Sequence, residues 1–250
     1  MNLELINSFN IFEEELLSLE KLENQGFNNI NYLLKTSKKS YIIRVFKSND
    51  SVNISRQFEY EIQKKAYKKN ITSNPIFFND DLIIYEYIRG IHKTKLTNKD
   101  IKNLITKVKK YHKFKVKEKI YDFKNDFHDY SKILKDNKSK IIIKKSLEIL
   151  KKIKKNKKDF VLTHHDLNPK NIIFNKNNIK IIDWEYSGVN NKFFDLASIC
   201  VEFNLNKKKE QLILENYFKN NKHSNLKKLN YFKTIYSNLC YLWFKKLNKK

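Results

Sequence analysis

Two short motifs in the second half of the chain place acids and amides at spacings suited to phosphoryl transfer. In the first, residues 164–171 (HHDLNPKN), Asp166 stands two residues after His164 and five residues before Asn171. In the second, Asp183 ends a short apolar run. Phosphoryl transfer needs a hydroxyl aimed at the phosphorus and positive charge held on the phosphate oxygens. The two motifs together offer groups for both tasks.

Each of these side chains has a distinct expected role, and the spacing is typical of a kinase catalytic loop followed by a metal-binding acid. Asp166 is expected to accept the proton of the attacking hydroxyl or to orient that hydroxyl. Asn171 and Asp183 offer oxygens to Mg²⁺, an ion that keeps several waters and needs few protein ligands. We therefore predict ATP and Mg²⁺ as cofactors. His164 is expected to anchor the loop, with direct catalysis as the alternative, and His165 is given no role.

Short strands are expected to position both acids. Apolar runs predict strands at residues 160–163, 171–174 and 179–182, with a polar hairpin turn at residues 175–178. Each acid then lies at the end of a strand, and the hairpin holds the second one in place.

The composition allows a sizeable core and argues against a nucleic-acid function. The chain has 250 residues, of which 40% are hydrophobic and 14% aromatic. The net charge of +25 comes from lysines scattered along the chain beside many Asn and Ile, residues that share A/T-rich codons. Arginine, which favours bidentate phosphate and base contacts, occurs only at positions 44, 56 and 89. We therefore expect no specific nucleic-acid partner.

Cysteine usage and hydropathy predict a cytoplasmic protein. No run approaches 18 uninterrupted apolar residues, and the first residues, MNLE, carry no basic region, so neither a membrane span nor a signal peptide is expected. Cys200 and Cys240 stand in apolar runs and are predicted to be buried free thiols. The oligomeric state is left open.

Helical spacing of apolar residues and the remaining patterns predict seven helices outside the catalytic motifs. The first includes Leu5, Phe9, Phe12, Leu16 and Leu19. The predicted helices cover residues 3–23, 56–69, 97–115, 127–156, 193–203, 207–221 and 225–247.

A longer pattern around Asp183 resembles a known family. It reads IDWEYSGxN over residues 182–190, followed by FDLA at residues 194–197. Together with HxDLxPxN at residues 164–171, it resembles the choline/ethanolamine kinases, including the bacterial LicA-type choline kinases of the aminoglycoside-phosphotransferase-like superfamily. Protein kinases carry D-F-G at the second motif instead. The resemblance extends from about residue 20 to the end of the chain.

The resemblance implies an α+β, bilobal protein-kinase-like fold. Residues 1–89 are expected to form a small β-rich N-terminal lobe, and residues 90–250 a larger helical C-terminal lobe. In the first lobe, the turn that covers the phosphates is expected to use Gly26 and Asn28, since Asn tolerates the backbone of a glycine better than most residues. Glu86 and Tyr87 lie in the hinge strand, whose backbone is expected to hold the adenine.

The same resemblance assigns roles to four further charged residues. Arg44, in the strand YIIRVF of residues 41–46, takes the place of the phosphate-contacting lysine of protein kinases. Glu59 is expected to pair with Arg44, and Glu61 is the rival for that role. Asp195 is expected to tie the catalytic loop to the following helix as a structural acid.

The resemblance also implies that the acceptor is choline, a quaternary ammonium held by aromatic faces and carboxylates. Glu185 and Asp166 are expected to supply negative charge, and Trp184, Tyr186 and Trp243 to line the site with aromatic rings. The alternative for Trp243 is ordinary packing of the last helix.

Three other functions compete with choline phosphorylation. A related kinase could act on ethanolamine, thiamine or an aminoglycoside, although the Lys-rich C-terminal third is poor in the acids that an aminoglycoside needs. A catalytically silent nucleotide-binding protein is a second alternative, against which the intact Asp166, Asn171 and Asp183 argue. Nucleic-acid binding rests on net charge alone.

Overall fold

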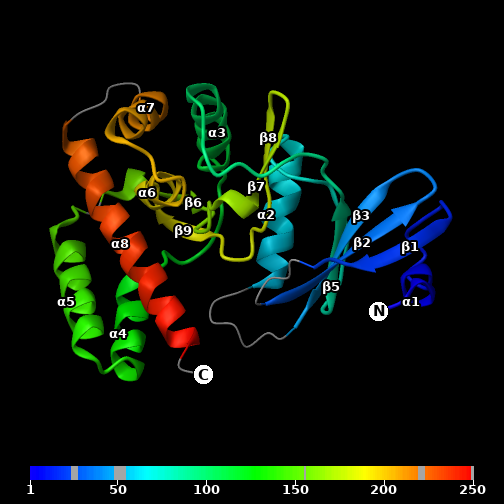
Figure 1. Ribbon diagram of the computed structural model, residues 1–250, viewed down its shortest axis with the longest axis horizontal. Helices are drawn as coiled ribbons and strands as arrows, with labels where there is room; N and C mark the ends of the chain where they lie inside the picture. Colours follow the sequence, from blue (N-terminus) through cyan, green and yellow to red (C-terminus); the bar gives the residue numbers. More distant parts are fainter. Residues whose placement is uncertain (24–27, 48–54, 155, 219–222, 249–250) are drawn as a thin grey trace. The chain divides into compact units, whose positions relative to one another are not determined.

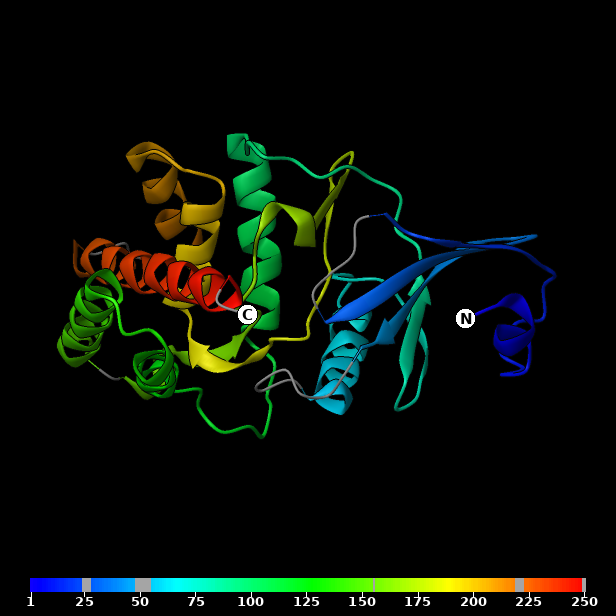
Figure 2. The ribbon, with the colours of Figure 1, turned by 60° about the horizontal axis from the view of Figure 1, so that its bottom comes forward.

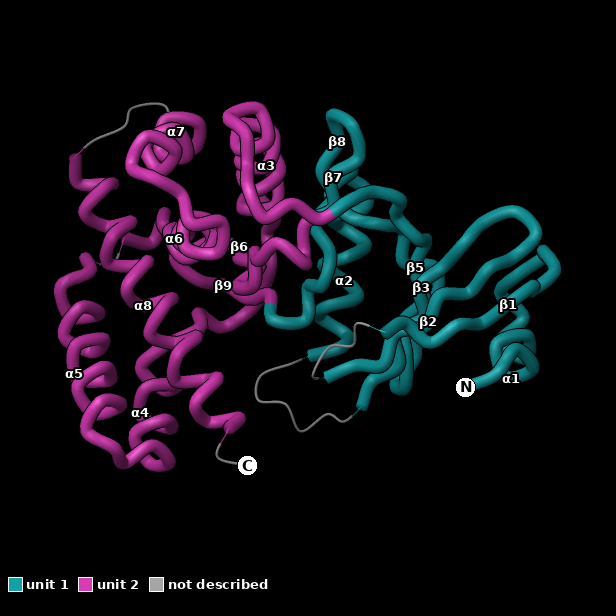
Figure 3. The backbone as a smooth tube through the Cα atoms, in the orientation of Figure 1, with its two compact units in different colours: residues 1–91, 173–186 teal, residues 92–172, 187–250 magenta. Residues whose placement is uncertain are grey.

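A computed structural model describes residues 1–23, 28–47, 55–154, 156–218 and 223–248, and these residues form two compact units. Unit 1 comprises residues 1–91 and 173–186, and unit 2 comprises residues 92–172 and 187–250 (Figure 3). Strands dominate the first unit and helices the second (Figure 1), which confirms the predicted α+β class.

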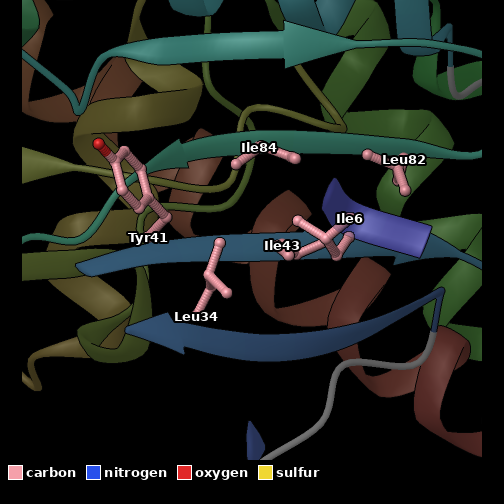
Figure 4. Close-up of a cluster of buried hydrophobic side chains, with 6 residues drawn as sticks. All are labelled: Ile6, Leu34, Tyr41, Ile43, Leu82 and Ile84. Carbon is pink, nitrogen blue, oxygen red and sulfur yellow. The ribbon is translucent and has the colours of Figure 1, made fainter. Parts of the chain in front are cut away.

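Unit 1 is built on a five-stranded antiparallel sheet with the order β1-β2-β3-β5-β4. The strands are β1 (Leu16–Lys21), β2 (Asn29–Thr36), β3 (Ser40–Phe46), β4 (Pro75–Phe78) and β5 (Leu82–Glu86). Side chains alternate between the two faces of a strand. One face of this sheet contributes Leu34, Tyr41, Ile43, Leu82 and Ile84 to a core cluster with Ile6 (Figure 4).

The predicted helix over residues 3–23 is wrong. The structure has a five-residue helix α1 (Leu3–Asn7), then a turn with Asn10 at φ 54°, and then β1. The apolar residues at helical spacing do face the core, since Phe9, Phe12, Leu16 and Leu19 pack against its cluster. Pairing with β2 provides hydrogen-bond partners for the backbone N–H and C=O groups of residues 16–21. In a helix, these groups would have to bond to one another within the segment.

Helix α2 (Arg56–Lys68) follows the sheet's third strand and confirms the helix predicted over residues 56–69. Ser55 caps its first turn by accepting a hydrogen bond from the Phe58 N–H. Ile62 and Ala66, fully buried, lie one turn apart on the face that packs into unit 1. This helix carries Arg56 and Glu59 in its first turn.

The hairpin of β7 (Ile172–Asn175) and β8 (Asn178–Ile181) confirms the two strands expected around the polar turn, and residues 173–186 group with unit 1. Ile91 and Phe174 exchange backbone hydrogen bonds of 2.9 Å, and the Ile181 N–H donates to the Ile71 carbonyl at 2.8 Å. The units therefore differ from the linear division at residue 89, because long-range backbone pairing attaches this hairpin to the first unit.

Gly90 makes one of these contacts possible. A Cβ atom at this position would lie 2.5 Å from the Ile173 side chain and 2.7 Å from the Phe174 carbonyl oxygen. A backbone oxygen cannot rotate away as a side chain can, so Gly90 is required for space rather than for an unusual φ.

Unit 2 contains six helices and two short strands among its described residues. The helices are α3 (Asn98–Tyr111), α4 (Phe123–Ile133), α5 (Asn137–Lys152), α6 (Phe193–Glu202), α7 (Lys207–Tyr217) and α8 (His223–Leu247). Helices α4 and α5 pack together against α8, α6 packs on α8, and α3 packs on α7 (Figures 1 and 2). Strand β6 (Phe160–Thr163) pairs with β9 (Gly188–Asn191).

The single helix predicted over residues 127–156 is also wrong, because two helices replace it. Leu134 ends α4 with an extended backbone and is fully buried, so the chain turns there to bury an apolar side chain. Asp136 then caps α5 by accepting from the Ser139 N–H.

Cys200 and Cys240 are free, as predicted; Cys200 is buried and Cys240 half-buried. Among the described residues, no helix has the length and apolar character that crossing a bilayer requires.

Candidate active site

The catalytic loop follows β6 in unit 2, and local capping fixes its shape. Asn168 caps a single 3-10 turn at Pro169–Asn171, with its side-chain oxygen accepting from the N–H groups of Lys170 (2.8 Å) and Asn171 (3.2 Å). Pro169 occupies the first position of this turn, where a missing N–H costs nothing. His92 Nδ1 lies 3.1 Å and 2.9 Å from the carbonyl oxygens of Pro169 and Ile172.

Both carboxylate oxygens of Asp166 are held by amides of its own loop. Asn168 Nδ2 donates to Oδ1 at 2.9 Å, and Asn171 Nδ2 donates to Oδ2 at 2.7 Å. Asn171 Nδ2 also donates to the Asp166 carbonyl at 2.9 Å. Because Asn171 Nδ2 donates to both the carboxylate and the carbonyl oxygen of Asp166, the amide oxygen of Asn171 points away from Asp166. This orientation leaves the oxygen available to bind a cation.

His164 and His165 fasten the loop to Asp195 through their backbone. The His164 N–H donates to Asp195 Oδ2 at 2.9 Å, and the His165 N–H donates to Oδ1 at 3.0 Å. His164 is fully buried, and its Nδ1 accepts from the Asp166 N–H at 3.3 Å, a geometry that supports anchoring rather than direct catalysis. His165 has φ 70°, a conformation that costs a non-glycine residue about 1–2 kcal/mol.

Asp195 is fully buried in the first turn of α6, where a helix N-terminus favours negative charge. Burial alone would raise its pKa, but hydrogen bonds from His112 and Tyr111 hold the pKa of Asp195 down, at about 2. The acid is therefore charged at neutral pH and binds two consecutive amides of the catalytic loop, which supports the structural role expected from the sequence.

The half-buried ring of His165, a residue with no predicted role, contacts three aromatic residues of unit 2. Its centroid lies 5.3 Å from the Tyr121 ring, 6.0 Å from Phe123 and 5.2 Å from Phe194. Asn190 Nδ2 lies 3.1 Å from His165 Nε2. Strand β9, which was not predicted, brings Asn190 to this ring.

In unit 1, a chain of alternating charges connects β3, α2 and the segment after β8. Arg44 Nη1 contacts Asp183 Oδ1 at 2.7 Å and Glu59 Oε1 at 3.1 Å. Arg56 Nη1 contacts Glu59 Oε2 and Glu185 Oε2, each at 3.0 Å. We call Asp183, Arg44, Glu59, Arg56 and Glu185, in this order, the ion-pair chain.

This arrangement decides between the two candidate partners of Arg44. Glu59 is buried between both arginines, whereas Glu61 is exposed on the other side of α2 and accepts from Gln57. Burial raises the pKa of Glu59 to about 7, while the two arginines act in the opposite direction. Burial alone would lower the pKa of Arg44, yet the charge of Asp183 helps to raise it well above its usual value.

Asp183 differs from the other acids of the ion-pair chain in its exposure. Its side chain is 26% exposed, against 1% for Glu59 and 6% for Glu185. It adopts φ 67°, again a strained conformation for a residue other than glycine. Of these three acids, Asp183 is thus the one whose carboxylate reaches solvent and could meet a metal ion.

The remaining residues of the second motif are committed to the protein. Trp184 is fully buried and donates from Nε1 to the Ile181 carbonyl at 3.1 Å, so its ring has no face for an acceptor. Glu185 accepts from Arg56, from Asn29 Nδ2 at 2.8 Å and from Asn28 Nδ2 at 3.0 Å. These partners explain its burial and remove it as the direct counter-ion expected from the sequence.

Four other predicted residues of unit 1 lie close to these groups or at the C-terminal end of β5, which is an inner strand of the sheet. Asn28 Nδ2 also donates to the Tyr186 hydroxyl at 2.7 Å, which joins the turn before β2 to the second motif. Glu86 pairs with Lys39 at 2.8 Å, and the Tyr87 N–H donates to the Ser40 carbonyl at 2.9 Å. Gly26 lies outside the described residues.

A second group of side chains in unit 2 is affected by the charge of Asp166, and it includes an acid with no predicted role, Glu202. The Tyr236 hydroxyl donates to Glu202 Oε1 at 2.8 Å. Burial raises the pKa of the Tyr236 hydroxyl and raises that of the Cys240 thiol to about 11. The negative charges of Glu202 and Asp166 raise both pKa values further. Glu202 and Asp166 therefore lie within electrostatic reach of the same two side chains.

Trp243 belongs to the same face of α8 as these residues. Tyr236, Cys240 and Trp243 follow each other at spacings of four and three, which places them on one side of a helix. Trp243 is half-buried and contacts Phe244 edge to face. Glu202 could have been found from the sequence only by knowing that α6 and α8 pack together.

Comparison with known proteins agrees with this geometry. The sequence profile of the choline/ethanolamine kinase family matches residues 16–238. The protein LicA of Haemophilus influenzae is 24% identical over 206 residues, which are 77% of this chain and 60% of that protein. The chain thus matches less than two thirds of the length of this relative.

Solved structures show the same fold at low sequence identity. The choline kinase LicA of Streptococcus pneumoniae superposes with a TM-score of 0.79 and 20% identity, covering 98% of this chain and 89% of that one. A spectinomycin phosphotransferase, in complex with ADP and spectinomycin, gives a TM-score of 0.73 at 18% identity, with coverages of 98% and 88%. The predicted protein-kinase-like fold is confirmed, and the match over residues 16–238 shows that the chain belongs to the choline/ethanolamine kinase family.

Proposed function

We propose that the protein is an ATP-dependent kinase that transfers the γ-phosphate to the hydroxyl of choline. The observation that carries this proposal is the catalytic loop, in which two amides hold Asp166 and two backbone N–H groups fasten the loop to a buried, charged Asp195. A carboxylate preorganised in this way is suited to orient a hydroxyl and to receive its proton, since its position is fixed before substrate binds.

Asn171 and Asp183 are the proposed ligands of Mg²⁺. Their fit rests on two observations: the Asn171 amide is oriented by its bonds to Asp166, and Asp183 is the exposed acid of the ion-pair chain. When bound, the ion neutralises charge on the phosphate oxygens. Arg44 is proposed to orient Asp183 and to add positive charge near the phosphates, and the Glu86–Tyr87 backbone to hold the adenine.

The acceptor is proposed to bind in unit 2, close to Asp166. Glu202 and Asp166 supply negative charge, while Trp243, half-buried on α8, supplies an aromatic face, and Tyr236, which is buried, holds Glu202 through its hydroxyl. A quaternary ammonium donates no hydrogen bonds, so such a site selects it by charge and cation–π contact. Tyr186 remains a candidate for the same contact, whereas Trp184 and Glu185 are left out because their burial and bonds keep them inside unit 1.

Turnover of ATP across a panel of acceptors tests the proposal. ADP formation is measured with choline, ethanolamine, thiamine and an aminoglycoside, for the wild type and for Asp166→Ala. We expect choline to give the highest kcat/KM, and the variant to lose on the order of 10²–10⁴-fold in kcat, as for loss of a positioned base. Preference for ethanolamine would overturn the choline assignment alone, and absence of turnover with every acceptor would overturn the kinase proposal.

A further inference from the structure

Behind the catalytic loop, a hydroxyl, an imidazole and a carboxylate stand in line within unit 2. The Tyr217 hydroxyl lies 2.7 Å from His112 Nδ1, and His112 Nε2 lies 3.0 Å from Asp195 Oδ2. Tyr217 is the last residue of α7, and His112 caps the C-terminal end of α3. These contacts thus connect two helices to the acid that holds the loop.

The bonding partners determine where the protons lie. Asp195 is charged and can only accept, so His112 Nε2 carries a proton and donates it to Oδ2. A neutral imidazole then accepts at Nδ1, which the Tyr217 hydroxyl satisfies as donor. With a neutral imidazole, the order of donors runs from Tyr217 through His112 to Asp195, and each group orients the next.

Four hydrogen-bond donors hold the carboxylate of Asp195 in position. Its Oδ2 accepts from the His164 N–H, from Tyr111 at 2.5 Å and from His112, while Oδ1 accepts from the His165 N–H. The side chain of Asp195 is fully buried, and that of His112 is 2% exposed, so water does not compete for these bonds. Removing one donor leaves a buried charge with an unfilled bonding position.

We propose that His112 and Tyr217 are positioning residues for phosphoryl transfer, which act through Asp195 on the backbone of residues 164–166. The inference rests on the proposed function, because it assigns to these residues an effect on turnover. Neither of them is proposed to contact substrate. Their effect is to hold the peptide groups that carry Asp166, and a loop displaced by about 1 Å can lose on the order of 100-fold in rate.

Steady-state kinetics on four variants test the proposal. Tyr217→Phe keeps the ring and removes only the hydroxyl, His112→Gln keeps a side-chain N–H donor, His112→Phe removes every donor, and His128→Gln changes an exposed histidine of α4 as the control. We expect kcat to fall about 3- to 10-fold for Tyr217→Phe, as for one lost hydrogen bond, and on the order of 10- to 100-fold for His112→Phe.

The split between parameters separates positioning from substrate binding. The KM values for ATP and for the acceptor should stay within about twofold of wild type, since neither residue is proposed to touch them. His112→Gln should recover part of the kcat lost in His112→Phe. An unchanged kcat in both Tyr217→Phe and His112→Phe would overturn the inference, and so would a kcat in His112→Gln as low as that in His112→Phe.

Amide hydrogen exchange gives a second readout that does not need activity. The N–H groups of His164 and His165 should exchange faster in His112→Phe and Tyr217→Phe than in wild type, while amides of the unit 1 sheet keep their rates. Equal exchange at residues 164 and 165 in all variants would refute the positioning role. If the wild type phosphorylates no acceptor, the proposed function fails. The exchange data would still decide whether Tyr217 and His112 hold the loop through Asp195.

Discussion

Glu59 is the residue of unit 1 whose replacement tests the ion-pair chain most sharply. It is 1% exposed and accepts from Arg44 at 3.1 Å and from Arg56 at 3.0 Å. The substitution Glu59→Gln preserves the volume and one oxygen but places an NH₂ group against one guanidinium. Both arginines are nearly buried, so each would then lack part of its compensating charge.

The expected loss is large for a single substitution. Removing one partner of a buried ion pair typically costs 3–5 kcal/mol, because the remaining charge stays desolvated. Since Glu59 connects two pairs and Gln retains one acceptor, we expect the free energy of unfolding to fall by about 3–5 kcal/mol rather than by twice that amount. Glu61→Gln, an exposed change two residues away, should stay within about 0.5 kcal/mol of wild type.

Urea unfolding followed by tryptophan fluorescence measures both variants. Trp184, fully buried in unit 1, reports on the unit that contains the substitution. Because burial raises the pKa of Glu59 to about 7, the comparison is made at pH 8, where the carboxylate is charged. A Glu59→Gln protein no less stable than Glu61→Gln, at equal m-values, would refute the reasoning.

Three further predictions concern packing, pH dependence and the acceptor. Gly90→Ala should destabilise the fold by about 1–3 kcal/mol in urea unfolding, because the new Cβ would lie 2.7 Å from a backbone oxygen. Gly188→Ala should change stability little, because the atom nearest to its new Cβ would be 3.6 Å away. Equal effects of the two substitutions would contradict the packing argument. Burial raises the pKa of Asp126 to about 6, so the native state holds this proton more tightly than the unfolded state does, and the contribution of Asp126 to stability is lost as pH rises from about 4 to 6. Asp126→Asn should therefore be up to about 2–3 kcal/mol more stable than wild type at pH 7 and equally stable below pH 4. A difference in stability that does not change with pH would refute this prediction. Trp243→Ala should raise the choline KM about 2- to 30-fold with a smaller change in the ATP KM, and an unaffected choline KM would return this residue to ordinary packing.

The catalytic loop could be predicted from sequence because its geometry is local. Asn168, Pro169 and Asn171 shape a turn within a few residues of Asp166, and the hairpin that follows brings Asp183 to the end of its strand. The helical spacing after Ser55 likewise predicted α2. What spacing could not decide was whether Glu59 or Glu61 faces Arg44, because that depends on how the helix lies on the sheet.

The errors have the same origin in long-range contacts. The first 23 residues carry apolar side chains at helical spacing, but β2 offers residues 16–21 a partner that lies more than ten residues away. The aromatic position of Trp184 suggested a contact with the acceptor, but the chain folds its ring into unit 1. His112, Arg56 and Glu202 escaped notice because their partners, Asp195, Glu185 and Tyr236, lie 34 to 129 residues away in sequence.

Direct detection of the product tests the central claim. ³¹P NMR of the wild-type protein with Mg²⁺, ATP and choline should show the γ-phosphate signal replaced by that of a phosphate monoester of choline and by ADP. Asp166→Ala, with an unfolding curve close to that of wild type, should show the monoester at a rate lower by on the order of 10²–10⁴-fold. A wild-type protein that releases only inorganic phosphate, or an Asp166→Ala variant within about threefold of the wild-type rate, would contradict the account.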